Sequence, residues 1–274
     1  MEDLVRVYGV TDGIPLYIQK FDPRLDFEEN LRENVFRVGK FLYQEAEMLL
    51  KEELRETARY FAILKAIAYG KHKFGTIANF TELDKGIISR YLANLAAIRL
   101  VRKEYPVTQK KELRNARYVF SDNYLNFWFR YVYPYRSLIE GGKTDRLFDI
   151  IRDDLNSYLG FVFEKVCSEF LWDQELPFAF TKLGRWWQKD NEIDVVALNE
   201  VRKEVAFFEV KWHDLTVGEA NQIITELKKK SESVAWNRGE RVEYFGLIAK
   251  RLAGKSELRA EGYLCYDFED MQEA

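Results

Sequence analysis

The stretch 184–212 places an acid and an acid–x–lysine pair at the ends of two short apolar runs. Asp194 begins the run that ends at Leu198, while Glu209 and Lys211 close the run that starts at Val205. Short apolar runs of this kind are typical of buried strands. Residues two apart on a strand point to the same face, so Glu209 and Lys211 are expected side by side. The pattern is typical of metal-dependent phosphodiester hydrolysis.

Carboxylates in this arrangement suit Mg²⁺ (or Mn²⁺), a hard cation that prefers oxygen ligands and keeps several waters. Asp194 and Glu209 would supply two ligands, and the carbonyl of Val210 a third. A bound cation polarises a phosphoryl oxygen and lowers the pKa of a bound water. Lys211 would orient that water or offset charge on the transition state. Glu164, on a preceding helix, is expected to bind the metal directly or through water.

The elements that must position these residues follow the order helix, three strands, helix, strand. Thr216 and Glu219 form a capping box, which marks the start of the second helix. The expected ranges are a helix over 152–171, strands over 178–182, 193–198 and 205–210, a helix from 216 to about 230, and a strand over 242–249.

This order and these residues resemble the PD-(D/E)XK nuclease superfamily, which includes restriction enzymes and archaeal Holliday-junction resolvases. The resemblance covers roughly 157–250. Asp194 matches the first acid of the motif, Glu209 and Lys211 match its E-x-K half, and Glu164 matches the helix-borne acid of many members. It implies a restriction-endonuclease-like α/β core in which these four residues are catalytic and the three acids hold the metal. The sequence departs from the pattern in having no proline before Asp194 and in having Glu226 where a tyrosine is frequent.

An alternative is open for the same residues. An E-x-K triplet after an apolar run is frequent in a chain rich in Glu and Lys, where it usually marks exposed charges at a strand end. A fold does not establish a function. A non-catalytic regulatory or interaction module with a relict nuclease core is therefore the alternative to a Mg²⁺-dependent DNA endonuclease.

A basic block precedes this region. Residues 59–120 carry 13 Lys and Arg against 4 Asp and Glu, whereas residues 1–58 carry 8 against 13. Helices are expected over 59–69, 74–80 and 85–98, followed by β runs over 100–107 and 116–121, which is the pattern of a winged helix. Packing against protein alone is the alternative to DNA contact. The residues expected to contact DNA are Lys85, Ser89 and Arg90 on the third helix and Lys110, Lys111 and Arg114 at the hairpin tip.

Two further segments are expected to be helical. Asp26 and Glu29 form a capping box, and apolar residues at helical spacing predict one long amphipathic helix that continues through Leu50. The aromatic segment 122–140 would either stack on bases or form a helix buried between domains. Packing is favoured, because Leu125 and Trp128 share a helical face with other apolar residues.

Composition bounds the class of protein. Apolar residues make up 47% of the 274 residues, enough for sizeable cores, and the net charge of −3 argues against a uniformly basic protein. Cys167 and Cys265 are expected to be buried free thiols in a reducing compartment. No membrane span or leader peptide is expected, so a cytoplasmic location is predicted. The predicted division is a helical segment at 1–58, a winged-helix domain at 59–140 and a nuclease-like domain at 141–274, a multidomain α+β or α/β architecture.

A wider resemblance is to the C-terminal part of a family of archaeal AAA-type ATPases, in which lid helices, a winged helix and a nuclease-like domain follow a P-loop domain. The residues that carry it are 13–18 (GIPLYI), the winged-helix run, 184–187 (GRWW) and 209–212 (EVKW). It implies an ATPase domain as a partner; DNA and a second copy of the chain are the other partners expected. The sequence G-x-x-x-x-G-K-[ST] does not occur, so no ATP site is expected in this chain.

Overall fold

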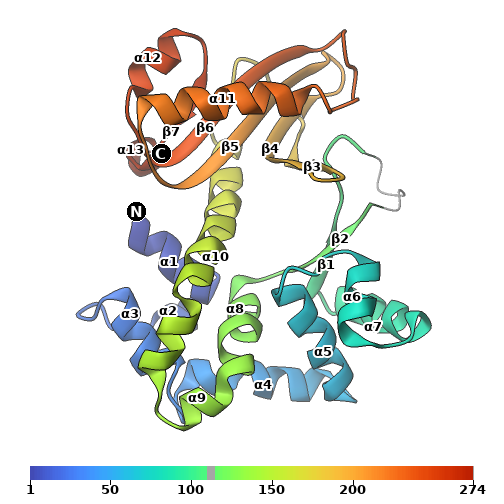
Figure 1. Ribbon diagram of the computed structural model, residues 1–274, viewed down its shortest axis with the longest axis vertical. Coiled ribbons are helices and arrows are strands. Elements are labelled where there is room, and N and C mark those ends of the chain that lie inside the picture. Colours follow the sequence, from blue (N-terminus) through green and yellow to red (C-terminus); the bar gives the residue numbers. More distant parts are fainter. Residues whose placement is uncertain (110–114, 274) are drawn as a thin grey trace. The chain divides into compact units, whose positions relative to one another are not determined.

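The computed structural model describes residues 1–109 and 115–273 and has a mixed α+β fold (Figure 1). The described residues divide into two compact units. The helical unit comprises 6–104 and 115–156, and the sheet unit comprises 1–5, the described part of 105–114, and 157–273. The predicted boundaries at 58 and 140 stay a prediction. No helix of the described residues combines the length and apolar character needed to cross a membrane.

The helical unit consists of short helices and a two-stranded antiparallel ribbon. Helices α1 and α10 each contribute residues to both units. The α-helices that begin in this unit or pass through it are α1 (Glu2–Thr11), α2 (Pro15–Ile18), α3 (Phe27–Asn30), α4 (Phe41–Glu53), α5 (Thr57–Ala68), α6 (Phe74–Thr81), α7 (Lys85–Ala97), α8 (Asn123–Phe127), α9 (Arg136–Glu140) and α10 (Thr144–Trp172). The ribbon pairs β1 (Val101–Glu104) with β2 (Arg117–Phe120).

The predicted long helix after Asp26 is wrong, although its capping box is present. After α3, the residues Leu31–Val35 form a π-helical turn, and α4 starts only at Phe41. Gly39 between them has φ +82°, which a continuing right-handed helix does not allow. The interruption leaves Val38 exposed, whereas the predicted apolar face would have buried it.

Helices α5, α6 and α7 followed by the β1–β2 ribbon match the predicted order of elements in residues 59–120. Asp84 caps α7, because its side chain accepts a hydrogen bond from the main-chain N–H of Gly86 at 2.7 Å. Residues at helical spacing on α7 are buried, namely Ile88, Tyr91, Leu92 and Leu95. These contacts fix which side of α7 is left to solvent.

The aromatic segment after β2 is packed inside the helical unit. Trp128, Phe129 and Tyr131 are almost fully buried, and Trp128 Nε1 donates to the main-chain oxygen of Tyr43 at 2.9 Å. Phe61 stacks edge-on against Phe129 with ring centroids 5.3 Å apart. The packing interpretation is confirmed, since these rings have no exposed face for a base.

The sheet unit has a mixed sheet of five strands within its described residues, in the order β3-β4-β5-β6-β7. β4 pairs antiparallel with both β3 and β5, whereas β6 pairs parallel with both β5 and β7. Helix α11 crosses one face of the sheet (Figure 1). The elements are β3 (Lys182–Gln188), β4 (Asn191–Asn199), β5 (Glu204–Leu215), α11 (Val217–Ser231), β6 (Val242–Leu252), α12 (Lys255–Ala260), β7 (Leu264–Tyr266) and α13 (Phe268–Glu273).

The first strand of the sheet lies later than predicted. The expected strand at 178–182 is a loop in which Phe178 stacks on Tyr244, and β3 begins only at Lys182. The pairing of β3 with β4 shifts between Gly184 and Trp186, and a bulge of this kind breaks the two-residue period that marks a strand. Trp186 and Trp187 are buried in β3.

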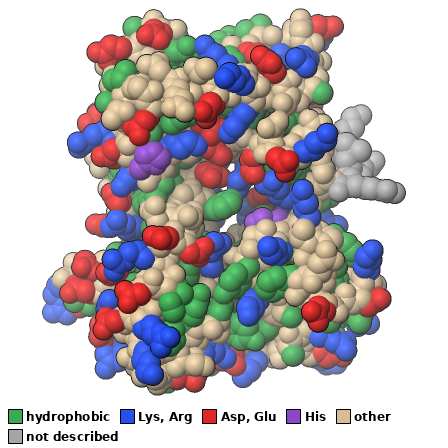
Figure 2. Space-filling view, viewed as in Figure 1, with side chains coloured by type: hydrophobic (Ala, Val, Ile, Leu, Met, Phe, Trp, Pro, Cys, Tyr) green, Lys and Arg blue, Asp and Glu red, His purple; other side chains and the backbone are tan. Residues whose placement is uncertain are grey.

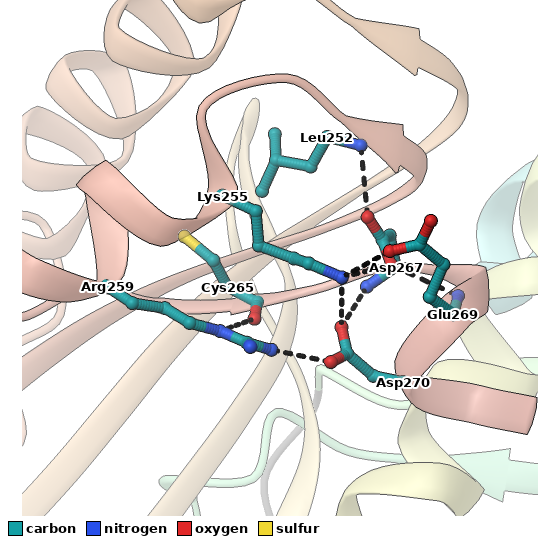
Figure 3. Close-up of polar contacts among 7 residues, drawn as sticks. All are labelled: Leu252, Lys255, Arg259, Cys265, Asp267, Glu269 and Asp270. Atoms are coloured by element: carbon teal, nitrogen blue, oxygen red, sulfur yellow. Dashed lines mark hydrogen bonds and ion pairs between the residues drawn. The ribbon is translucent and has the colours of Figure 1, made fainter. Parts of the chain in front are cut away.

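A network of charged groups stabilises the β7 edge of the sheet (Figure 3). Asp267 is buried and accepts hydrogen bonds from Lys255 Nζ at 2.6 Å and from the main-chain N–H of Leu252 at 3.3 Å. Asp270 in turn binds Lys255 at 3.1 Å and Arg259 at 2.7 Å. Because each acid is paired, this cluster ties α12 and α13 to the parallel side of the sheet.

Candidate functional site

The two predicted ligand acids lie where β4 and β5 separate. The last paired residues of these strands are Val195 and Phe208, so Asp194 and Glu209 are the next to face each other. They are not paired through their main chains. Instead, Asp194 Oδ2 accepts a hydrogen bond of 2.9 Å from the main-chain N–H of Val210. The Asp194 side chain thus replaces a backbone partner at the end of the ladder.

Glu209 is nearly fully buried and is held by two lysines. Lys211 Nζ donates to one oxygen at 2.8 Å, and Lys230 Nζ on α11 donates to the other at 2.7 Å. Lys211 Nζ also lies 3.8 Å from Asp194 Oδ2. The structure therefore brings Asp194, Glu209 and Lys211 together, as their spacing in the sequence predicts.

Glu164 reaches the same region from α10. Its Oε2 lies 3.1 Å from Nη2 of Arg185, which is on β3. The same Nη2 donates to Glu192 Oε1 on β4 at 2.5 Å. Glu164 Oε2 itself is buried and accepts no hydrogen bond from the described residues.

Burial and mutual repulsion shift the pKa values of two of the acids. Loss of solvent raises the pKa of Glu164 to about 8, with Arg185 opposing the shift and the charge of Asp194 adding to it. Burial likewise raises the pKa of Asp194 to about 6, and the nearby charge of Glu209 adds to that shift. A high pKa means that the negative charge of each group is costly in the metal-free protein, and a bound cation would relieve that cost.

Lys211 stays protonated in this surrounding. Burial lowers the pKa of Lys211, but the carboxylates of Glu209 and Asp194 outweigh burial and leave its pKa raised. A raised pKa suits a fixed positive charge beside a reacting phosphate rather than a base that takes a proton from water.

The described residues do not contain three Asp, Glu, His or Cys side chains already gathered at metal-binding geometry. The donor set nevertheless fits a hard cation in two respects. Asp194 and Glu209 offer carboxylate oxygens at neighbouring strand positions, and the Oε2 of Glu164 is a buried acceptor that lacks a hydrogen bond. For a cation to bind Glu209, either Lys211 or Lys230 must release the carboxylate oxygen to which it donates.

Three residues at the site, Arg185, Glu192 and Lys230, were not predicted from the sequence. Arg185 belongs to the GRWW run named above for the wider resemblance, and Lys230 ends a lysine run on α11. The signal available for Lys230 is its spacing of fourteen residues from the capping residue Thr216, which fixes its helical position but not its partner. Their roles depend on pairing between elements far apart in the chain.

The residues predicted for DNA contact are placed in part. Lys85, Ser89 and Arg90 are all exposed on α7. Arg90 lies over the ring of Tyr91, with its Cζ 5.3 Å from the ring centroid. The other three predicted residues, Lys110, Lys111 and Arg114, lie outside the described residues. On the face in Figure 2, basic and acidic side chains are interspersed over both units.

Comparisons with known proteins identify similar sequences, but none of these sequences has an assigned activity. Residues 128–223 match the model of a family described as "Archaea bacterial proteins of unknown function". An uncharacterized protein of Methanocaldococcus jannaschii is 39% identical over 275 residues, which covers 98% of this chain. The chain spans 60% of the length of that relative. No solved structure matches the chain.

Proposed function

We propose that the sheet unit hydrolyses phosphodiester bonds in DNA with the help of Mg²⁺ or Mn²⁺. The observation that carries the proposal is the meeting of Asp194 and Glu209 at the separating ends of two strands, with Lys211 Nζ in contact with both. Two acids and a lysine at this position combine a cation site with a fixed positive charge.

Each residue has a task that follows from its position. Asp194 and Glu209 would hold the cation, which when bound supplies polarisation of the phosphate and a more acidic water. Lys211 places its charge beside the developing negative charge of the transition state. The buried oxygen of Glu164 has no hydrogen-bond partner among the described residues and would be able to accept one from a water. The hydrogen bond from Val210 fixes the Asp194 carboxylate in place.

The helical unit supports DNA as the substrate. Helices α5 to α7 and the β1–β2 ribbon follow the order of a winged helix, and Lys85, Ser89 and Arg90 are exposed on the third helix of that set. In such domains the third helix enters the major groove, and basic side chains contact phosphates. We propose that the helical unit binds duplex DNA and the sheet unit cuts it.

Cleavage by a variant without the central charges tests this function. The double variant Asp194→Ala/Lys211→Ala is expected to lose at least about 100-fold in the rate of Mg²⁺-dependent cleavage of plasmid or branched DNA. The double variant Asp190→Ala/Lys229→Ala is a matched control, because it removes the same two residue types from exposed positions of the sheet unit. Cleavage at the wild-type rate by the first variant contradicts the proposal.

A second candidate is a non-catalytic regulatory or interaction module that works with an ATPase domain. It is favoured by the pairing of both Glu209 oxygens with lysines, which closes the site to cations in the metal-free protein. The greater length of the relative from M. jannaschii also agrees with a larger assembly. Calorimetric titration with Mn²⁺ separates the two candidates. A site that Glu209→Ala abolishes argues for the nuclease, and the absence of binding by the wild-type protein argues for the module.

A further inference from the structure

We propose that a hollow in the helical unit, between the end of α7 and the outer edge of β1, binds a backbone phosphate of duplex DNA. This inference rests on the proposed function and adds a contact to those predicted from the sequence, since Lys85, Ser89 and Arg90 all lie on the first half of α7. The hollow has a volume of about 540 Å³. The described residues that line it are Ala96, Arg99, Val101, Arg102, Lys103 and Ser121.

The hollow carries an excess of positive charge. Three basic side chains line it, and its described lining includes no acid. Arg102 is paired with Glu104 at 2.7 Å, whereas Arg99 and Lys103 form no ion pair with a described residue. The C-terminal end of a helix has a partial negative charge equivalent to about half an elementary charge, which two full positive charges exceed. Guanidinium and ammonium groups in this state suit a phosphate.

Arg99 occupies a backbone position that favours glycine. Its φ is +60°, in the left-handed region, and it follows the residue that caps the C-terminus of α7. Its main-chain N–H donates to the oxygen of Ala96 at 3.2 Å, and that of Leu100 donates to the oxygen of Leu95 at 3.0 Å. This is a Schellman motif, in which glycine is the usual residue because a side chain there is strained. An arginine in its place indicates that the guanidinium has a use.

The outer edge of β1 adds a main-chain donor. Within the described ribbon β1 pairs only with β2, and Lys103 lies opposite Tyr118. The N–H of Tyr118 is directed away from β1, because it donates to the main-chain oxygen of His72 at 2.7 Å. Two residues opposite each other in an antiparallel pair direct their main-chain groups either both inward or both outward. The N–H of Lys103 therefore points out of the ribbon, at the edge that borders the hollow.

The hollow lies on the side of α7 that carries two of the predicted DNA contacts. Ala96 follows Lys85 by eleven residues and Ser89 by seven, which is close to three and two whole turns of the helix. The hollow is thus in line with both residues, about 16 Å along the helix from Lys85. The major groove is about 12 Å wide, so a helix whose first turns contact base edges brings its far end to the phosphates at the rim of the groove.

Binding of duplex DNA by the full chain tests the site. Fluorescence anisotropy over a range of salt concentrations, with a chelator present to prevent cleavage, measures the affinity and its dependence on salt. Arg99→Gly/Lys103→Gln is expected to lose about 10-fold or more in affinity and to reduce the slope of log affinity against log salt by about 2. The loss should be equal for two unrelated DNA sequences, because phosphate contacts carry no sequence information.

The matched control is Arg37→Gln/Lys51→Gln, which removes the same two residue types at positions of the helical unit that are paired with acids. It should bind DNA as the wild type does. Thermal unfolding separates DNA binding from a role in ending α7. Arg99→Gly alone should unfold at or above the wild-type temperature, because glycine relieves the strain, and yet bind DNA more weakly. Wild-type affinity in this variant shows that Arg99 serves the helix only and overturns the site.

Each further result has a distinct meaning. Wild-type affinity and slope in Arg99→Gly/Lys103→Gln overturn the site and leave the proposed hydrolysis standing. The expected loss of binding, in a protein that binds DNA without cleaving it when Mg²⁺ is added, supports the site and overturns the hydrolysis. Absence of DNA binding by the wild type overturns the site and DNA as the substrate together. Should the double variant fail to fold, Arg99→Gly alone decides, since its substitution suits the backbone.

Discussion

The carboxylate of Asp194 completes the hydrogen bonding of a neighbouring strand, because it accepts the main-chain N–H of Val210 at 2.9 Å. The bond spans the gap left where β4 and β5 stop pairing after Val195 and Phe208. One side chain therefore serves the sheet and, under the proposed function, would also bind the cation. The two tasks depend on different properties, since the sheet needs an acceptor oxygen and the metal centre needs a negative charge.

Substitution of Asp194 by Asn and by Ala should separate these tasks. Both variants lack the charge, but Asn keeps an oxygen that can accept from Val210. We expect Asp194→Ala to be less stable than Asp194→Asn by about 1–3 kcal/mol, the usual cost of leaving a buried N–H without a partner. Urea unfolding of the metal-free proteins measures the difference, and both variants should lose Mn²⁺ binding. Equal stability of the two variants would show that the hydrogen bond contributes nothing.

The stability of the metal-free protein should depend on Glu164 above neutral pH. The folded-state pKa of Glu164 is about 8, which is above the ordinary value of 4.5, so the folded protein binds a proton that the unfolded chain releases. Stability is then highest below the ordinary value and falls as the pH rises toward 8. Between pH 6 and pH 8.5 we expect a loss of at least about 1 kcal/mol. Chemical unfolding in the presence of a chelator measures it.

Glu164→Gln supplies the control for this pH dependence, since the amide does not titrate. The variant should show a flatter dependence over the same range and be the more stable protein at pH 8.5. Saturating Mg²⁺ should raise wild-type stability most at the alkaline end, where the acids are charged. A wild-type profile that is as flat as that of Glu164→Gln contradicts the prediction.

Gly246 on β6 should tolerate no side chain. A Cβ at this position would lie 2.3 Å from ring carbons of Phe208 and 2.6 Å from the main-chain oxygen of Leu264. Gly246→Ala should therefore lower the free energy of unfolding by about 2–3 kcal/mol, because neither the buried ring nor the backbone can move away freely. Gly218→Ala on α11 is the control. A Cβ there meets nothing within 4 Å, and alanine should stabilise the helix by about 0.5–1 kcal/mol. Thermal unfolding distinguishes the two.

Lys85 and Arg90 should contribute to DNA affinity through phosphate contacts. We expect each alanine variant to weaken binding to duplex DNA and to reduce the slope of log affinity against log salt by about 1, since fewer counterions are released. Fluorescence anisotropy over a range of salt concentrations measures the slope. Arg37→Ala, which removes an exposed arginine paired with Glu33, should leave the slope unchanged. An unaltered slope in both α7 variants would remove the support for DNA binding by this helix.

The parts of the structure predicted well are those with local signals. The alternation of side chains along a strand places Glu209 and Lys211 on one side of β5, and the capping boxes at Asp26 and Thr216 form as their spacing indicates. Cys167 and Cys265 are buried free thiols, as the apolar residues around them in the sequence predict. In each case the determining contacts lie within a few residues.

The errors arise where the chain departs from a regular period. The π-helical turn Leu31–Val35 adds a residue to the turn, so apolar spacing that fits one helix is divided between two. The bulge at Gly184 similarly interrupts the two-residue period, so that β3 was not recognised at its true position in the sequence. The pairing of Arg185 with Glu164 joins residues on different elements, and no spacing along the sequence specifies it.

The two sides of the candidate centre should differ in how readily they open. Strand β5 has hydrogen-bonded neighbours on both sides over Glu204–Phe208, whereas Asp194 lies beyond the last pair of β4 with β5. Amide hydrogens in the doubly paired segment will exchange with solvent only when the sheet as a whole opens. The amide of Val210 is held by a side chain on that edge, so its exchange will report on local opening of the Asp194 side. The centre thus combines a segment of β5 that resists opening with a flank at Asp194 that opens more readily. A bound cation would raise the protection of the Val210 amide to that of the doubly paired segment.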